Sequence, residues 1–252
     1  MKITIDSKIF QHAPALRLGC VLLEGIVNDG PESNALLKKL RNIVQETQHS
    51  FSLDTLTEVP FVSRWRSVYR SFGAKPSDYR SSIENLIRMV LNGRELSHIS
   101  TLVDLYNFLS LKYKLPVGGE DVDEIIGEMR LTVAEGTEPP VKLLGSQQPE
   151  PPFMGEIVYR DDEGIICRCF NWREAARTSL QKSTKNAIIV MEAIDPEEYA
   201  TLDVALDGLM TLSGHFLGGT MKRVVLTKDS PSVDFSFVAT VSPEQAEMVK
   251  YG

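Results

Sequence analysis

The sequence lacks the long apolar runs and targeting patterns that mark several classes of protein. No segment approaches the ~20 apolar residues that a membrane-spanning helix requires. The N-terminal residues alternate in polarity like a strand and do not contain the apolar core of a signal peptide. Cysteine is scarce, and its odd number, three, favours a reducing compartment over a disulfide framework. We therefore expect a soluble, cytoplasmic protein with no membrane association.

The signatures of common cofactor and metal sites are also missing. The sequence has no GxxxxGK[ST] or GxGxxG loop, no HExxH spacing and no GxSxG elbow. Cys167 and Cys169 place two thiols on one face of a predicted strand, but no second cysteine pair or nearby histidine completes a zinc site. Two core cysteines are the simpler interpretation. We expect no metal, no cofactor and no conventional serine or cysteine hydrolase.

Charge is negative overall but unevenly distributed. The net charge of −7 disfavours a protein that coats nucleic acid, and we expect no DNA partner. Residues 60–115 nevertheless carry nine Lys and Arg against four acids, whereas residues 116–163 carry three against twelve. A local basic surface suits one structured anionic partner, although solvated helix faces would give the same pattern. The candidate RNA-binding residues are Arg64, Arg66, Arg70 and Arg80.

Apolar periodicity and capping signals predict helices and strands interleaved irregularly in one mixed domain over residues 1–252. An apolar content of 42% is enough for an ordinary core. Helices are predicted over residues 33–45, 62–72, 82–91, 100–115 and 195–214. Strands are predicted over residues 1–5, 16–26, 128–133, 141–144, 156–160, 165–170, 186–192, 221–227 and 233–240.

The predicted helix over residues 100–115 is apolar on almost every face, which is typical of a buried helix. Asp104, Asn107 and Ser110 interrupt it at a spacing of three and so form one narrow polar stripe. Buried polar groups need hydrogen-bond partners, or each costs about 1–3 kcal/mol. Either neighbouring backbone supplies those partners, or the stripe lies at the floor of a binding site. Both interpretations remain open from the residues alone.

Two further clusters are candidates for a pocket. Asn171, Trp172 and Arg173 follow a predicted strand and combine an amide, an aromatic ring and a cation, as pocket rims tend to do. Alternatively, Trp172 only covers a sheet edge and Arg173 pairs with an acid. The adjacent glycines Gly118 and Gly119 indicate tight backbone or the close approach of another group.

An ordered set of segments resembles the B3/B4 domain, the editing region of the phenylalanyl-tRNA synthetase β subunit. The set comprises residues 98–108 (HISTLVDLYNF), Leu115-Pro116, residues 121–127 and residues 130–137, and the likeness is best over residues 60–192. The resemblance implies an α+β fold in three layers, with a β-sandwich or mixed sheet packed with helices. It also implies a pocket between sheet and helix, with residues 1–59 as an N-terminal extension.

The same resemblance implies a trans-editing hydrolase that deacylates mischarged aminoacyl-tRNA, binds the tRNA acceptor end and does not aminoacylate. Val117 and Gly118 follow Pro116 where the bacterial domain has a pocket histidine, and Glu192 lies two residues beyond the position of a tyrosine-reading glutamate. Tyrosine specificity and a histidine mechanism are therefore not inferred. The alternatives are a non-catalytic tRNA- or RNA-binding module and a small amino-acid-binding protein. Candidate catalytic residues are Asp104, Asn107, Asn171 and Thr178; candidate substrate-binding residues are Gly118, Gly119, Trp172, Arg173 and Glu192.

Overall fold

The computed structural model describes residues 1–30 and 34–248, which form an α+β fold with two β-sheets. The larger sheet has six strands in the order β10-β1-β4-β5-β6-β7, and only the β1–β4 pair is parallel. Its strands are β1 (Lys2–Ile5), β4 (Glu128–Val133), β5 (Ile157–Arg160), β6 (Ile165–Arg168), β7 (Arg173–Glu174) and β10 (Ser232–Asp234).

The smaller sheet has four antiparallel strands in the order β3-β8-β2-β9. Its strands are β2 (Arg17–Glu24), β3 (Val117–Asp121), β8 (Asn186–Ala193) and β9 (Thr220–Leu226). The central strands β2 and β8 are buried along nearly their whole length, as their almost continuous apolar sequences predict. The two sheets meet at a polar contact, because the Tyr159 hydroxyl on β5 reaches Glu192 on β8.

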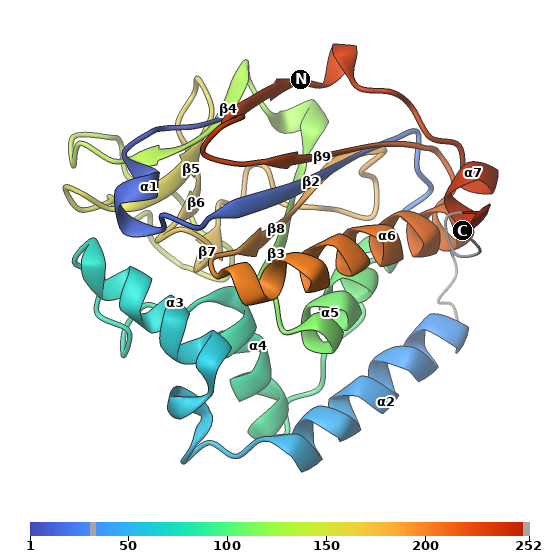
Figure 1. Ribbon diagram of the computed structural model, residues 1–252, viewed down its shortest axis with the longest axis horizontal. Coiled ribbons are helices and arrows are strands. Elements are labelled where there is room, and N and C mark those ends of the chain that lie inside the picture. The colour runs from blue at the N-terminus through green and yellow to red at the C-terminus, as the bar shows by residue number, and fades with distance from the viewer. Residues whose placement is uncertain (31–33, 249–252) are drawn as a thin grey trace.

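Helices cover the face of the smaller sheet that lies away from the larger one (Figure 1). Helices α5 and α6 pack on the sheet, and α2 and α4 pack on the outside of α5. Gly19 on β2 permits this contact, because a Cβ atom there would lie 2.6 Å from Leu206 of α6. The helices are α1 (Ile9–His12), α2 (Asn34–Ser50), α3 (Pro60–Ser71), α4 (Ser82–Leu91), α5 (Thr101–Tyr113), α6 (Tyr199–Phe216) and α7 (Pro243–Met248). The predicted α+β fold in layers of sheet and helix is confirmed.

Several local predictions are confirmed by the caps. The Ser81 hydroxyl accepts the backbone N–H of Glu84 at the start of α4, which is one of the two contacts of the predicted capping box. The Glu84 carboxylate accepts from Arg66 and Arg88. The Ser100 hydroxyl likewise accepts the N–H of Val103 at the start of α5. The predicted central helix is buried along most of its length, and one continuous core of buried side chains extends from residue 3 to residue 246.

Two predicted strands are wrong. Residues 141–144 make only isolated bridges, because prolines before and after them remove backbone N–H donors that a longer ladder needs. The strand predicted over residues 233–240 ends at Asp234, whose carboxylate accepts the N–H of Ser236 and starts a 3-10 turn over residues 235–237. The predicted helix end at Gly214 is also wrong, since α6 continues to Phe216. The predicted helix start at Ser33 lies outside the described residues.

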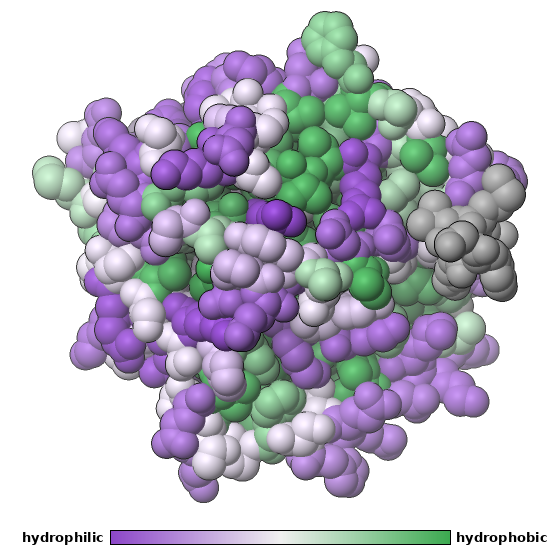
Figure 2. Space-filling view, viewed as in Figure 1, coloured by the Kyte–Doolittle hydropathy of each residue, from purple (hydrophilic) through white to green (hydrophobic). Residues whose placement is uncertain are grey.

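The surface is mainly hydrophilic on the face shown in Figure 2, with a hydrophobic group over the region of β9. Within residues 1–30 and 34–248, no helix is both long and apolar enough to cross a membrane. All three cysteines are buried and free, which agrees with the interpretation of Cys167 and Cys169 as core residues.

Candidate functional site

A cavity of about 200 Å³ lies between the two sheets. Its walls come from β3 and β8 of the smaller sheet, from β4 to β7 of the larger sheet, and from residues 170–172. Three glutamates line it: Glu120 on β3, Glu174 on β7 and Glu192 on β8. Glu120 and Glu192 are 4% and 1% exposed, and Glu174 is half-buried. Carboxyl groups almost withdrawn from water, gathered at one cavity, are what a binding or catalytic site tends to contain.

Glu192 is held by two side chains that donate to its two oxygens. The Tyr159 hydroxyl donates to Oε1 at 2.8 Å, and the Asn171 side-chain amide donates to Oε2 at 3.3 Å. Burial raises the pKa of Glu192 to about 7; the two hydrogen bonds oppose this rise, and the nearby Glu174 carboxyl adds to it. The group is therefore close to half-ionised at neutral pH and can both take up and release a proton.

Asn171 connects Glu192 to two helices. Its side-chain oxygen accepts the Tyr69 hydroxyl of α3 at 3.1 Å and the backbone N–H of Ser82, the first residue of α4, at 3.3 Å. These contacts fix the orientation of the amide, so that its N–H₂ group points at Glu192. The sequence predicted that Asn171 lies at a pocket, and the structure brings it together with Glu192, Trp172 and Arg173 along one cavity wall.

The turn that carries Asn171 has an unusual backbone. Cys169 and Phe170 have φ angles of 45° and 64°, in the left-handed region that costs non-glycine residues about 1–3 kcal/mol each. Glu156 stabilises the turn by accepting the Cys169 N–H at 2.9 Å and the Arg168 guanidinium at 2.7 Å. The Phe170 ring packs 5.0 Å from the ring of Trp65. The surrounding structure thus maintains a strained conformation directly beside the cavity.

The other two cavity glutamates, Glu120 on β3 and Glu174 on β7, lie close together. Glu174 accepts the backbone N–H of Gly119 at 3.3 Å, and burial raises its pKa to about 7 against the effect of that hydrogen bond. Burial, and then the Glu174 carboxyl, raise the pKa of Glu120 well above its ordinary value. Gly118 leaves room for these groups, since a Cβ atom there would lie 3.2 Å from Glu174 Oε1. The Thr178 side chain hydrogen-bonds to the Glu120 carboxyl and opposes that rise in its pKa.

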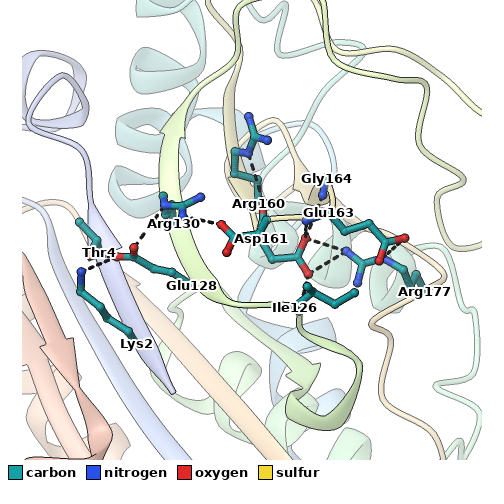
Figure 3. Close-up of polar contacts among 11 residues, drawn as sticks. Lys2, Thr4, Ile126, Glu128, Arg130, Arg160, Asp161, Glu163, Gly164 and Arg177 are labelled. Atoms are coloured by element: carbon teal, nitrogen blue, oxygen red, sulfur yellow. Dashed lines mark hydrogen bonds and ion pairs between the residues drawn. The ribbon is translucent and has the colours of Figure 1, made fainter.

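An arginine clamp holds the segment that follows β7 (Figure 3). The Arg177 guanidinium donates at 2.9 Å to both oxygens of Asp161 and at 2.7 Å to the carbonyl of Glu124. Although burial opposes ionisation of Asp161, N–H groups of Ile126 and Gly164 and the Arg177 guanidinium keep its pKa below the usual value. These contacts hold Arg177 in place and so fix the backbone that leads to Thr178.

That next residue, Thr178, is fully buried, and its carbonyl accepts the Asp121 N–H at 2.8 Å. Its side chain neighbours Glu120 and lowers the pKa of that carboxyl. Thr178 is not among the residues that line the cavity. Its predicted catalytic role therefore stays a prediction. Thr178 contacts Glu120, and Glu120 lines the cavity.

A second hollow of about 330 Å³ adjoins the cavity between α4, α5 and the loop before α5. The two share Trp172, Glu174 and two further lining residues, so the Trp172 ring borders both. Of the polar stripe on α5, Asn107 and Ser110 line the second hollow. This hollow matches the predicted pocket between sheet and helix, whereas the first cavity lies between the sheets.

The stripe residues also have internal partners. Asp104 is 2% exposed and is hydrogen-bonded to the His98 ring at 2.6 Å. The Ser110 hydroxyl donates to the Leu115 carbonyl at 2.7 Å. Both interpretations left open by the sequence therefore hold in part: the stripe borders a hollow, and two of its members are bonded to the protein itself.

Trp172 and Arg173 form a stack at the edge of the cavity. The Arg173 guanidinium lies 4.7 Å from the centre of the Trp172 ring, and the Tyr79 ring meets the same indole edge-on at 4.8 Å. Gly119, by contrast, is constrained by packing, since a Cβ atom there would lie 2.5 Å from Ile189. Its N–H is directed at Glu174, as described above.

The four candidate RNA-binding arginines divide into two groups. Arg64 pairs with three acids just before α6 and is 29% exposed, and Arg70 is exposed on α3. Arg66 binds both oxygens of the fully buried Glu84, and Arg80 lies 3.8 Å from the same carboxylate. Their role in RNA binding stays a prediction.

Sequence reasoning missed Glu120, Glu174 and Tyr159. A signal was present for Glu120, which directly follows the two glycines, and for Glu174, which directly follows the Asn-Trp-Arg triplet. Within the described residues, no group of three or more His, Cys, Asp and Glu side chains is arranged to hold a metal ion. Burial raises the pKa of the Cys167 thiol, so it is a poor nucleophile in this environment.

Comparison with known proteins gives three similarities. The family model of the B3/4 domain matches residues 64–207. The uncharacterized protein YhzB of Bacillus subtilis (strain 168) is 21% identical over 135 residues, which are 54% of this chain and 65% of that protein. An N-terminal fragment of the phenylalanyl-tRNA synthetase β-subunit from Pyrococcus horikoshii is 13% identical at a TM-score of 0.38. That match covers 82% of this chain and 48% of the fragment.

This chain thus spans just under two thirds of the Bacillus relative and about half of the synthetase fragment. The family match includes most of α3, all of α4 and α5, the turn that carries Asn171 and all three cavity glutamates. Since that match covers more than half of the sequence, the chain belongs to the B3/4 domain family.

Proposed function

We propose that this protein hydrolyses the ester bond of a mischarged aminoacyl-tRNA. The observation that carries the proposal is the Asn171–Glu192 pair, oriented by Tyr69 and Tyr159 on the wall of a cavity between the sheets. Membership of the B3/4 family and the resemblance to a synthetase editing region support the same chemistry. An editing hydrolase is needed because a synthetase separates side chains that differ by one methylene only ~10–200-fold.

In this proposal the aminoacyl group enters the cavity, and Glu192 accepts a proton from the attacking water. A carboxyl with a pKa of about 7 is suited to that task, since it is partly ionised at neutral pH. It takes a proton from the water as the new C–O bond forms, and it gives that proton to the ribose oxygen as the ester C–O bond breaks. Asn171 holds the carboxylate in one orientation through its amide. An aminoacyl ester is intrinsically labile, so positioning the water and the ester accounts for a large part of the rate without a nucleophilic residue.

The tRNA end rests in the second hollow. The Trp172 indole borders both spaces, and an aromatic face there suits stacking of the terminal base. Arg66, Arg80 and Arg88 surround the single carboxylate of Glu84 beside that hollow, which leaves an excess of positive charge for phosphate groups.

The test is deacylation of a panel of mischarged tRNAs by the purified protein. We expect turnover of at least one, and an Asn171→Ala variant should be at least tenfold slower because Glu192 loses its orienting donor. Asn92→Ala is the matched control, since this exposed asparagine only caps the end of α4 through the Arg88 carbonyl. No turnover by the wild-type protein on any member of the panel would reject the function.

A second candidate is an RNA-binding module without catalysis, favoured by the clustered arginines alone. It predicts tRNA binding that weakens steeply with salt, because each neutralised phosphate releases counterions. It also predicts that an Arg70→Ala variant binds more weakly while the Asn171→Ala variant binds as the wild type does. Binding that is unaffected by Arg70→Ala, together with turnover, separates the two candidates in favour of the hydrolase.

A further inference from the structure

Three arginines from α3, α4 and the connector between them meet at one buried carboxylate. Glu84, in the first turn of α4, is 0% exposed. Its two oxygens accept the Arg66 guanidinium at 3.0 and 3.1 Å, and one of them also accepts Arg88 at 2.9 Å. Arg80 adds a third guanidinium, whose Nε atom lies 3.8 Å from the same carboxylate. One negative charge therefore faces three positive charges.

Arg80 exceeds what Glu84 needs. Arg66 and Arg88 already donate three hydrogen bonds to the carboxylate, and these compensate for its lost hydration. The Arg80 Nε atom is buried and has no hydrogen-bond partner within the described residues. Native structures rarely keep such a donor unless a ligand or water completes the site. An arginine beside two others is also repelled by them, and an anion bound at the cluster removes that repulsion.

The surroundings of the cluster are positive as well. Residues 66–94 carry six Lys and Arg against two acids, although the whole chain has a net charge of −7. The second of these acids, Asp78, is exposed and accepts the Ser77 hydroxyl. The side chains of Arg66, Arg80 and Arg88 are 17%, 35% and 23% exposed, so solvent reaches all three. An anion that approaches this acidic protein is therefore directed to this surface.

Donor geometry and charge balance both indicate a phosphate group. The planar guanidinium presents paired N–H donors that match two oxygens of a phosphate. Three guanidiniums and one carboxylate leave a surplus of two positive charges. A phosphate monoester has a charge of about −1.5 to −2 at pH 7, whereas a phosphate inside a nucleic-acid strand has one negative charge. The monoester is the closer match to the surplus.

We propose that Arg66, Arg80 and Arg88 form a binding site for a phosphate monoester. Two sources carry this group: a free nucleotide, and the 5′ end of an RNA strand. The 5′ phosphate of a tRNA lies at the same end of the molecule as its 3′ ester, so the choice of this source rests on the proposed function. The cluster is close to the cavity wall, because the N–H of Ser82, less than one helical turn before Glu84, donates to Asn171.

The first test compares ligands that differ only in the phosphate. AMP and adenosine form one pair, and an RNA hairpin of the tRNA acceptor stem with a 5′ phosphate or a 5′ hydroxyl forms the other. Each is titrated into the full-length protein by calorimetry at about 0.15 M salt, which screens long-range attraction. We expect the phosphorylated member of at least one pair to bind at least tenfold more tightly. Equal binding within both pairs would overturn the site.

The two pairs also identify the source of the phosphate. A preference in the nucleotide pair assigns the site to free nucleotides, and a preference in the RNA pair alone assigns it to the RNA end. Methylation of the phosphate in the tighter-binding ligand leaves one negative charge and should weaken binding at least threefold. Equal affinity of the methylated ligand would overturn the choice of a monoester.

Variants locate the binding. Arg80→Gln should abolish the preference for the phosphorylated ligand, while Glu84 keeps its hydrogen bonds from the other two arginines. Arg80→Lys is the second variant, used where Arg80→Gln fails to fold by circular dichroism. It keeps the charge, loses the paired donors and should reduce the preference. Arg94→Gln, an exposed arginine after α4, is the control and should bind as the wild type does. An unchanged preference in the folded Arg80 variants would reject the assignment.

The outcomes for this site and for the hydrolase are distinguishable. A phosphate preference without deacylation of any tRNA leaves the site standing and rejects the proposed function. Where a mischarged tRNA is deacylated, removal of its 5′ phosphate should raise KM at least threefold and leave kcat unchanged, because the cluster contacts no reacting atom. Deacylation with the same KM for both forms of the tRNA supports the function and rejects the tRNA 5′ end as the occupant.

Discussion

Replacing Glu192 by glutamine should remove a pH-dependent loss of stability. The folded protein holds this carboxyl at a pKa of about 7, against an ordinary value of 4.5, chiefly because it is buried. A group whose pKa is raised by folding stabilises the native state fully below the ordinary pKa, and that contribution is lost as pH rises through the folded value. The wild-type protein should therefore lose stability between about pH 4.5 and pH 8 through this group.

The magnitude follows from the size of the shift. Each pKa unit corresponds to about 1.4 kcal/mol, so a rise from 4.5 to about 7 corresponds to roughly 3 kcal/mol in total. Part of it is already lost at pH 5, because the unfolded chain is then largely ionised. Between pH 5 and pH 8 we expect the free energy of unfolding to change by about 2–3 kcal/mol in favour of Glu192→Gln. Glutamine resembles the protonated form, because it is uncharged and has a carbonyl oxygen that accepts beside a group that donates.

The assay is urea unfolding of both proteins from pH 5 to pH 8.5, followed by circular dichroism. At pH 5 the variant should be equal to or less stable than the wild type, because Tyr159 and Asn171 then compete for one oxygen. Glu46→Gln, on the exposed surface, is the control for general effects of removing a negative charge. A difference between variant and wild type that stays constant within about 0.5 kcal/mol over this pH range would refute the reasoning.

Three further substitutions test the packing that shapes the site, each by chemical unfolding. Gly119→Ala should destabilise the protein by about 1–3 kcal/mol, because the added Cβ atom would lie 2.5 Å from Ile189. Gly164→Ala is the control, since its Cβ atom would meet open space. Equal losses of stability in the two variants would contradict the close approach at Gly119. Cys169→Gly should be about 1 kcal/mol more stable than Cys169→Ala, because φ is 45° at this position and glycine adopts that conformation without strain. The opposite order of stability would show that the turn relaxes in the variants. Arg168→Leu should cost about 3–5 kcal/mol by leaving buried Glu156 unpaired, and a loss below 1 kcal/mol would mean that Glu156 finds other donors.

The elements that could be predicted from the sequence are those with local signals. The helix α4 was located by Ser81 and Glu84, whose capping contact depends on residues three apart. The helix α5 was located by its apolar faces, and the core strands β2 and β8 by continuous apolar runs. The wrong strand over residues 233–240 failed for a local reason too, since Asp234 accepts the N–H of Ser236 and turns the chain.

The site was only partly predictable because its contacts join residues far apart in sequence. Asn171 meets Tyr69 and Glu192 across 102 and 21 positions, and neither partner is marked by spacing around Asn171. The polar stripe of α5 was visible, but whether Asp104 faced solvent or His98 depended on a loop without periodic structure. Glu120 is the clearest omission: Gly118 and Gly119 directly before it indicate a close approach, but they do not tell whether the acid that follows is buried or exposed.

The strained turn at Cys169 and Phe170 and the buried carboxyls are two energetic costs at the same cavity. Each lowers stability, through backbone strain in one case and lost hydration in the other, and both are held in place by contacts further from the cavity. Glu156 and Arg168 support the turn from one side, and Arg177 clamps the segment beyond β7 from the other. A cavity that served only as a packing gap would relax toward apolar walls and ordinary backbone. Costs that gather around one hollow, with the supporting contacts outside it, are the distribution expected where a ligand completes the site.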